Sequence, residues 1–151
     1  MVERAPTGRG HTYWLLRDNV YVEEILDQAF LAERDIPDMM FAFIEEAMRE
    51  SAVSVVLFGS YARGDQTVES DVDLVIVAGD EATKARLQAA LETLAGTFRR
   101  RFGASLSALV YSREEAAAMR TRAPELFESV WHEGITVLGL DVDEWAIDAN
   151  R

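Results

Sequence analysis

Two aspartates near the middle of the chain are the residues with the clearest capacity for chemistry. Asp71 and Asp73 stand one residue apart in the run SDVDLVIV, at the beginning of an apolar segment. In a β-strand, residues two apart point to the same face and lie roughly 6.5 Å apart along the chain. A carboxylate that is buried without a partner is costly, so the pattern predicts that these two acids bind something cationic.

A glycine–serine pair ends the preceding apolar segment, VSVVLF. Gly59 allows the backbone to approach a ligand closely, and Ser60 offers a hydroxyl at the start of a short predicted helix, SYAR. Exposed backbone N–H groups at such a turn suit phosphate oxygens. Arg63 is expected either to bind phosphate or to pair with Asp65 or Glu69.

The glycine–serine turn and the acid pair meet if their two segments are antiparallel neighbours in a sheet. An anion-binding turn beside two carboxylates fits a divalent cation that bridges carboxylate and phosphate. The pattern therefore predicts Mg²⁺, or Mn²⁺ in its place, together with a nucleoside triphosphate, for which ATP is the expected choice.

Two other motifs are excluded by single residues. A P-loop requires Lys directly after its second glycine; Gly59 and Gly64 have that spacing, but Asp65 follows. An EF-hand loop would require an oxygen-bearing side chain and then a glycine where Val75 and Ile76 stand.

The string GSYARG followed by SDVDLVIV resembles the signature of the polymerase-beta-like nucleotidyltransferase superfamily, and is most similar to its minimal nucleotidyltransferases. The resemblance implies that Asp71 and Asp73 are the catalytic acids and the Mg²⁺ ligands. It implies attack of an acceptor hydroxyl on the α-phosphate of the nucleotide, with release of pyrophosphate. The nucleotide-binding residues would be Gly59, Ser60, Arg63, Gly64 and Ser70.

The sequence departs from that family at one position. Family members typically carry a third carboxylate on a later strand, but here the corresponding segment, ASLSALVYS, has Ser107, or alternatively Ser105, in its place. A serine hydroxyl carries no charge and is a poor base near neutral pH. Catalysis is then weak, or another group substitutes, or the protein is a non-catalytic nucleotide-binding regulator or antitoxin relative.

The elements around these residues predict an α/β (α+β) fold with a small mixed sheet and helices packed on one face. Periodicity and capping residues place a helix that restarts at Asp35, a long helix from Asp80 to Gly103, and a capping box at Ser112. The expected strands cover residues 53–58, 72–77, 105–111 and 135–138.

Three regions are expected along the chain. Residues 1–18 form an N-terminal β-ribbon arm whose sequence is similar to the wing of a winged-helix module, and would be a remnant of one. Residues 19–140 form the nucleotidyltransferase domain with its leading helices. Residues 141–151 form a C-terminal tail in which Trp145 folds back on the body.

Composition limits the partners and the location. The 151 residues carry a formal net charge of −12 and no cysteine, which excludes disulfides and thiolate chemistry. Such a charge does not support a broad nucleic-acid interface, although a local one stays open. The acceptor hydroxyl is expected on a protein, a nucleic acid or a small molecule, and the resemblance to minimal nucleotidyltransferases implies a toxin as a further partner. No stretch approaches the roughly 18 apolar residues of a membrane span, so a cytoplasmic protein without membrane contact is expected.

Overall fold

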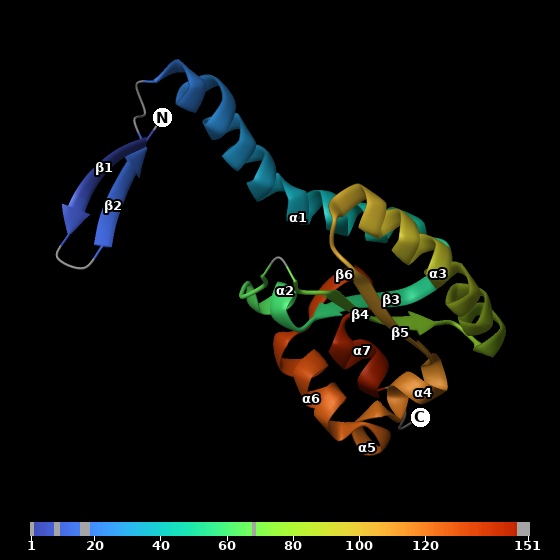
Figure 1. Cartoon of the computed structure of the whole chain (residues 1–151). Coiled ribbons are helices and arrows are strands. Elements are labelled where there is room, and N and C mark those ends of the chain that lie inside the picture. Colours follow the sequence, from blue (N-terminus) through green and yellow to red (C-terminus); the bar gives the residue numbers. More distant parts are fainter. Residues whose placement is uncertain (1, 8–9, 16–18, 68, 148–151) are drawn as a thin grey trace. The chain divides into compact units, whose positions relative to one another are not determined.

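The computed structural model describes residues 2–7, 10–15, 19–67 and 69–147 (Figure 1). The chain divides into two compact units, Met1–Met39 and Met40–Arg151. In the first unit, β1 (Val2–Thr7) and β2 (Gly10–Leu15) pair as an antiparallel hairpin. The predicted β-ribbon is thereby confirmed over these residues, while its resemblance to a wing and the boundary at residue 18 stay predictions.

The helical region after the arm contradicts one prediction. A short π-helix, η1 (Val22–Leu26), leads into α1 (Asp27–Met48), which continues through Pro37. The predicted helix start at Asp35 is therefore wrong. A proline inside a helix removes a single backbone hydrogen bond, and here the helix-forming residues on both sides outweigh that loss.

The second unit is built on a four-stranded mixed sheet. Its strands follow the order β5-β4-β3-β6, in which β3 pairs antiparallel with both β4 and β6, and β4 pairs parallel with β5. All four strands were expected from their apolar or alternating sequences. Their bounds are β3 (Ala52–Phe58), β4 (Val72–Ala78), β5 (Leu106–Ser112) and β6 (Ile135–Gly139).

Helices cover both faces of this sheet, whereas the sequence interpretation placed them on one (Figure 1). One face packs against α3 (Glu81–Phe102) and residues 40–48 of α1. The other packs against four short helices, α4 (Arg113–Ala117), α5 (Met119–Arg122), α6 (Pro124–Glu133) and α7 (Val142–Ile147). The reason lies in the strands themselves, because β3 and β4 are apolar on both sides and each side must be covered.

Capping residues fix the helix ends that were expected. The side chain of Asp80 accepts a hydrogen bond from the Thr83 amide at 2.7 Å, and Gly103 ends α3 in a left-handed conformation. Ser112 opens α4 with a capping box, and Trp145 on α7 is buried in the second core, as predicted. Among the described residues, no helix is long and apolar enough to cross a membrane.

Three phenylalanines pin the end of α3 against α1. The rings of Phe98 and Phe102 on α3 lie 6.0 and 5.7 Å from that of Phe43 on α1, and Arg101 stacks over Phe43 and Phe102. β5 begins three residues after Gly103, so this aromatic cluster at the end of α3 stands close along the chain to the beginning of β5.

Gly139→Ala is expected to destabilise the protein much more than Gly103→Ala. Both glycines have positive φ (80° and 76°), so either substitution costs about 1–2 kcal/mol of backbone strain. A Cβ at Gly139 would also lie 2.0 Å from the carbonyl oxygen of Val53, whereas one at Gly103 would meet open space. Urea denaturation gives both free energies of unfolding; equal losses would contradict the tight packing of β6 on β3.

Candidate active site

A row of three paired residues crosses β3, β4 and β5 at the end of β3, where the nucleotide and cation were expected to bind. Asp73 on β4 pairs with Phe58 at the end of β3 and with Ser107 at the beginning of β5. The three positions share the face that packs against α4–α7, because alternate residues of β4 on the other face, such as Leu74, lie in the α3 core. The antiparallel pairing of β3 and β4, on which the prediction depended, is confirmed.

Gly59 brings the turn after β3 into contact with Asp73. Its backbone has φ 73° and ψ −151°, a region that glycine alone adopts readily. A Cβ placed on Gly59 would lie 2.8 Å from the Oδ2 atom of Asp73. Both the conformation and the contact therefore require glycine, and Ser60 follows at once as the first residue of α2 (Ser60–Arg63).

Asp73 is the carboxylate whose environment most disfavours its charge. Partial burial raises its pKa above the ordinary value, and the nearby charge of Asp71 raises it further. The Ser107 hydroxyl on the adjacent strand acts in the opposite direction and lowers the pKa of Asp73. Asp71 itself is exposed and lies just before β4, so the pair offers one sheltered and one open carboxylate.

Arg63 pairs with acids on two sides. Its guanidinium lies 3.2 Å from Asp65 and 2.8 Å from Glu133 at the end of α6, and these hydrogen bonds raise its pKa. Of the two predicted partners, Asp65 is confirmed. The Glu133 contact spans 70 residues of sequence, and no local pattern would have revealed it. In this arrangement Arg63 braces α2 against α6.

Gly64 and Ser70 shape the loop between the turn and the acids. Gly64 caps α2 in a left-handed conformation with open space at its Cβ position. The Ser70 hydroxyl accepts a hydrogen bond from the Thr67 amide at 2.8 Å, and the Ser70 amide bonds back to the Thr67 carbonyl at 3.0 Å. Ser70 thus closes a turn directly before Asp71.

Ser107 and Ser105 are the two residues expected to stand in place of a third family carboxylate. Ser107 is the residue paired with Asp73, while Ser105 lies before β5 and its carbonyl accepts a bond from the Val72 amide at 2.8 Å. Glu115 does not substitute, because it closes the α4 capping box and pairs with Lys84. In the part of the chain that the structure describes, no three His, Asp or Glu side chains gather as metal ligands.

Two carboxylates nevertheless fit a hard divalent cation. Mg²⁺ is commonly held by one or two protein carboxylates together with substrate phosphates and water. Asp71 and Asp73 supply oxygen ligands only, and each carboxylate is close enough to the other for their charges to repel. The backbone of Gly59 can lie against Asp73 only because glycine has no Cβ. The donor set therefore suits a hard divalent cation beside a backbone turn that a ligand can approach closely.

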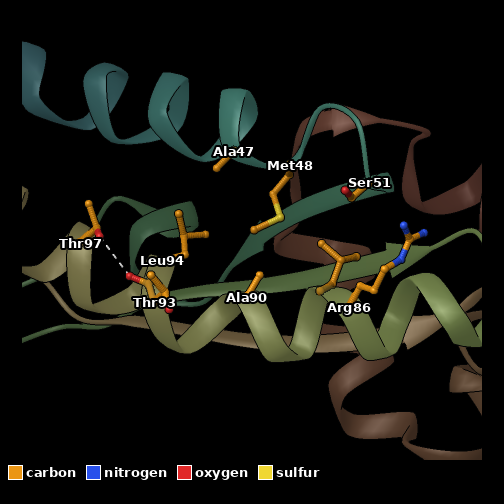
Figure 2. A pocket seen from close by; sticks show the side chains of 9 residues that line it. Ala47, Met48, Ser51, Arg86, Ala90, Thr93, Leu94 and Thr97 are labelled. Atoms are coloured by element: carbon orange, nitrogen blue, oxygen red, sulfur yellow. Dashed lines mark hydrogen bonds between the residues drawn. The ribbon is translucent and has the colours of Figure 1, made fainter.

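An apolar groove elsewhere in the second unit does not involve these residues. Figure 2 shows this groove between the end of α1 and α3. It has a volume of about 590 Å³, and its lining includes Met48 and Leu94. Its lining includes Arg86 and Thr97 but none of the residues expected at the nucleotide site. The candidate active site thus lies at the end of β3 and the beginning of β4, and it shares no residue with this groove.

Comparison with known families identifies the class of protein. The model of the nucleotidyltransferase domain family matches residues 43–131, which contain the turn, both aspartates and Ser107. The chain belongs to the nucleotidyltransferase domain family. The resemblance seen in the sequence is therefore confirmed, as is the mixed sheet with helices that it implied.

Individual relatives are more distant. A protein of Methanocaldococcus jannaschii named "Putative protein adenylyltransferase MJ0141" is 31% identical over 70 residues, 46% of this chain and 70% of its own length. A crystal structure of a toxin–antitoxin with AMP-PNP is 20% identical, covers 72% of this chain and 82% of its own, and has a TM-score of 0.49. A mutant of the MntA–HpeT toxin–antitoxin is 18% identical, with the same coverage and TM-score. Structural likeness at this level carries no conclusion about activity.

Asp73→Asn is expected to stabilise the metal-free protein near neutral pH. Since the folded state raises the pKa of Asp73, folding disfavours its charged form, and that penalty is fully present above the raised pKa. The penalty disappears as the pH falls through the folded and then the unfolded pKa. The urea midpoint of the variant should therefore exceed that of the wild type at neutral pH, and the gap should shrink on acidification.

The matched control is Glu69→Gln, which removes an exposed loop carboxylate from the same connection. Its midpoint should follow the wild type at every pH, with chelator present throughout. A gap between Asp73→Asn and wild type that widens on acidification would contradict the burial of this charge.

Proposed function

We propose that this protein transfers AMP from ATP to a hydroxyl group of a protein, with Mg²⁺ or Mn²⁺ as cofactor and pyrophosphate as the second product. The observation that carries the proposal is the contact between the glycine–serine turn and Asp73, where a Cβ at Gly59 would lie 2.8 Å from the carboxylate oxygen. This contact supports the binding of phosphate and cation side by side. Family membership supports transfer of a nucleotidyl group in general.

Each residue of the site has a distinct proposed role. Asp71 and Asp73 would ligate the cation, which would neutralise charge on the phosphates. The backbone at Gly59 and the Ser60 hydroxyl would hold the outer phosphates, because glycine leaves the backbone open to close approach. Gly64 and Ser70 would line the loop, and Arg63 would position α2 through its two ion pairs.

The reaction is a substitution at the α-phosphorus. The acceptor oxygen forms a bond to that phosphorus, the bond to the bridging oxygen of the β-phosphate breaks, and pyrophosphate leaves with the electron pair. The proton of the acceptor hydroxyl passes to solvent. Positioning and electrostatic stabilisation would supply most of the acceleration, because the site offers no third carboxylate as a base.

A protein acceptor is favoured over a nucleic acid by two observations. The relative that shares 31% identity is named as a protein adenylyltransferase. The formal net charge of −12 would repel a polyanion over most of the surface, and surface potentials act on encounter rates as well as on affinity.

Ser107 motivates a second candidate function, nucleotide binding without transfer, as in a regulator or an antitoxin-like protein. A hydroxyl in place of the third carboxylate leaves a binding site intact but removes a metal ligand and a base. Transfer of label from α-labelled ATP to any acceptor distinguishes the candidates. Labelling that requires both aspartates eliminates the second one.

Replacing both aspartates with asparagine, Asp71→Asn together with Asp73→Asn, is expected to abolish cation-dependent ATP binding. Titration calorimetry with ATP and Mg²⁺ should show at least a tenfold loss of affinity, equivalent to about 1.4 kcal/mol. The matched control, Asp141→Asn with Asp143→Asn, alters two exposed acids of identical spacing at α7 and should bind as the wild type does. Indistinguishable heats for the site variant and the wild type would refute the proposal.

A further inference from the structure

The hydroxyl of Ser107 occupies an unusual place for a side chain without an assigned role. It is exposed, it lies at the beginning of β5, and it belongs to the residue that pairs with Asp73 in the register of β4 and β5. Phe58, Asp73 and Ser107 form one row across three strands, and the glycine–serine turn begins directly after Phe58. A nucleophilic oxygen thus stands beside the residues proposed to hold the triphosphate.

We propose that Ser107 is itself an acceptor, so that the protein nucleotidylates its own site. This inference rests on the proposed function, since it requires a nucleoside triphosphate bound at Asp71 and Asp73. The inference makes Ser107 a modification site. It thereby assigns a chemical role to this serine, which stands where a carboxylate was expected. A site that holds its nucleophile in place loses little entropy on reaching the reactive geometry.

Other hydroxyls near the turn are less suited to this role. The Ser70 hydroxyl already has hydrogen-bond partners in Thr67: it lies 2.8 Å from the Thr67 amide nitrogen and 3.3 Å from the Thr67 hydroxyl oxygen. Ser60 lies at the turn where the outer phosphates are proposed to bind. Ser105 precedes β5 and is paired through its backbone with Val72. Ser107, by contrast, pairs with Asp73 in the register of β4 and β5.

The edge position of β5 leaves Ser107 accessible. In the four-stranded sheet β5 pairs with β4 only, so its outer edge carries no further strand. Side chains of β5 alternate between partly buried and exposed, and Ser107 belongs to the exposed set. A nucleotide lying over the sheet edge can therefore reach this hydroxyl without displacing the core.

The transfer step balances without a further reactant. The Oγ atom of Ser107 forms a bond to the α-phosphorus, and the bond between that phosphorus and the β-bridging oxygen breaks. Pyrophosphate leaves with the electron pair, and the serine proton passes to the surrounding water. The product is a phosphodiester between Ser107 and the nucleoside, and each chain can carry out the step once.

Intact-mass spectrometry after incubation with ATP and Mg²⁺ tests the inference. The wild type is expected to gain the mass of one nucleoside monophosphate less one water, with Ser107 as the modified residue in peptide maps. Ser107→Ala should lose the adduct completely. The matched control, Ser105→Ala, makes the same change two residues earlier and should retain it. An adduct that persists in Ser107→Ala, or one that maps to another residue, would overturn the inference.

Two further measurements separate this inference from the function on which it rests. Ser107→Asp removes the acceptor hydroxyl, so it should gain no mass, and calorimetry on the wild type reports ATP binding independently of the adduct. If the wild type binds ATP but gains no mass after prolonged incubation, the inference fails and the nucleotide site stands. If calorimetry shows no ATP binding at all, the proposed function fails as well.

Discussion

The candidate site depends on one close contact between a backbone turn and a carboxylate. Gly59 and Asp73 approach so closely that any side chain on Gly59 would collide with the carboxylate. The arrangement brings a second negative charge, that of Asp71, near a partly buried one, and the folded state therefore disfavours charge at Asp73. A structure that accepts such a cost is suited to a cation, which converts the repulsion into binding energy.

The rest of the fold keeps that contact in place. β3 and β4 are covered on both faces, so apolar residues on each side of the two strands pack against a helical layer. The Phe43–Phe98–Phe102 cluster at the end of α3 stands close along the chain to the beginning of β5. On the opposite face, the ion pair between Arg63 and Glu133 holds α2 against α6. Contacts of α1 and α3 thus lie near the β5 side of the site, and the contact with α6 lies near the α2 side.

Much of this could be predicted from the sequence, because its signals are local. The acid pair, the glycine–serine turn, the caps at Asp80 and Ser112 and the four strands all follow from residue spacing. The helix through Pro37 was missed because propensity rules penalise an interior proline more than this context does. The helix that begins at Ser112 was expected, but its packing on a second face of the sheet was not, because a cap shows where a helix begins and not which face of the sheet it covers.

Long-range pairings lay beyond sequence reasoning. Nothing near Arg63 indicates Glu133, since the two meet only when β6 and α6 return to the sheet. The sequence left Ser105 and Ser107 open as replacements for a third carboxylate, and the parallel register of β4 with β5 pairs Ser107 with Asp73. Beside Asp73, Ser107 therefore presents a neutral hydroxyl and not a further negative charge.

Paramagnetic broadening by Mn²⁺ in the presence of a non-hydrolysable ATP analogue tests the central claim most directly. Amide signals in NMR spectra should broaden first at Gly59, Ser60, Asp71, Asp73 and Ser107, and the broadening should require the nucleotide analogue. Broadening confined to the exposed acids of α7, or spread evenly over the acidic surface, would contradict a cation site at the edge of β3 and β4.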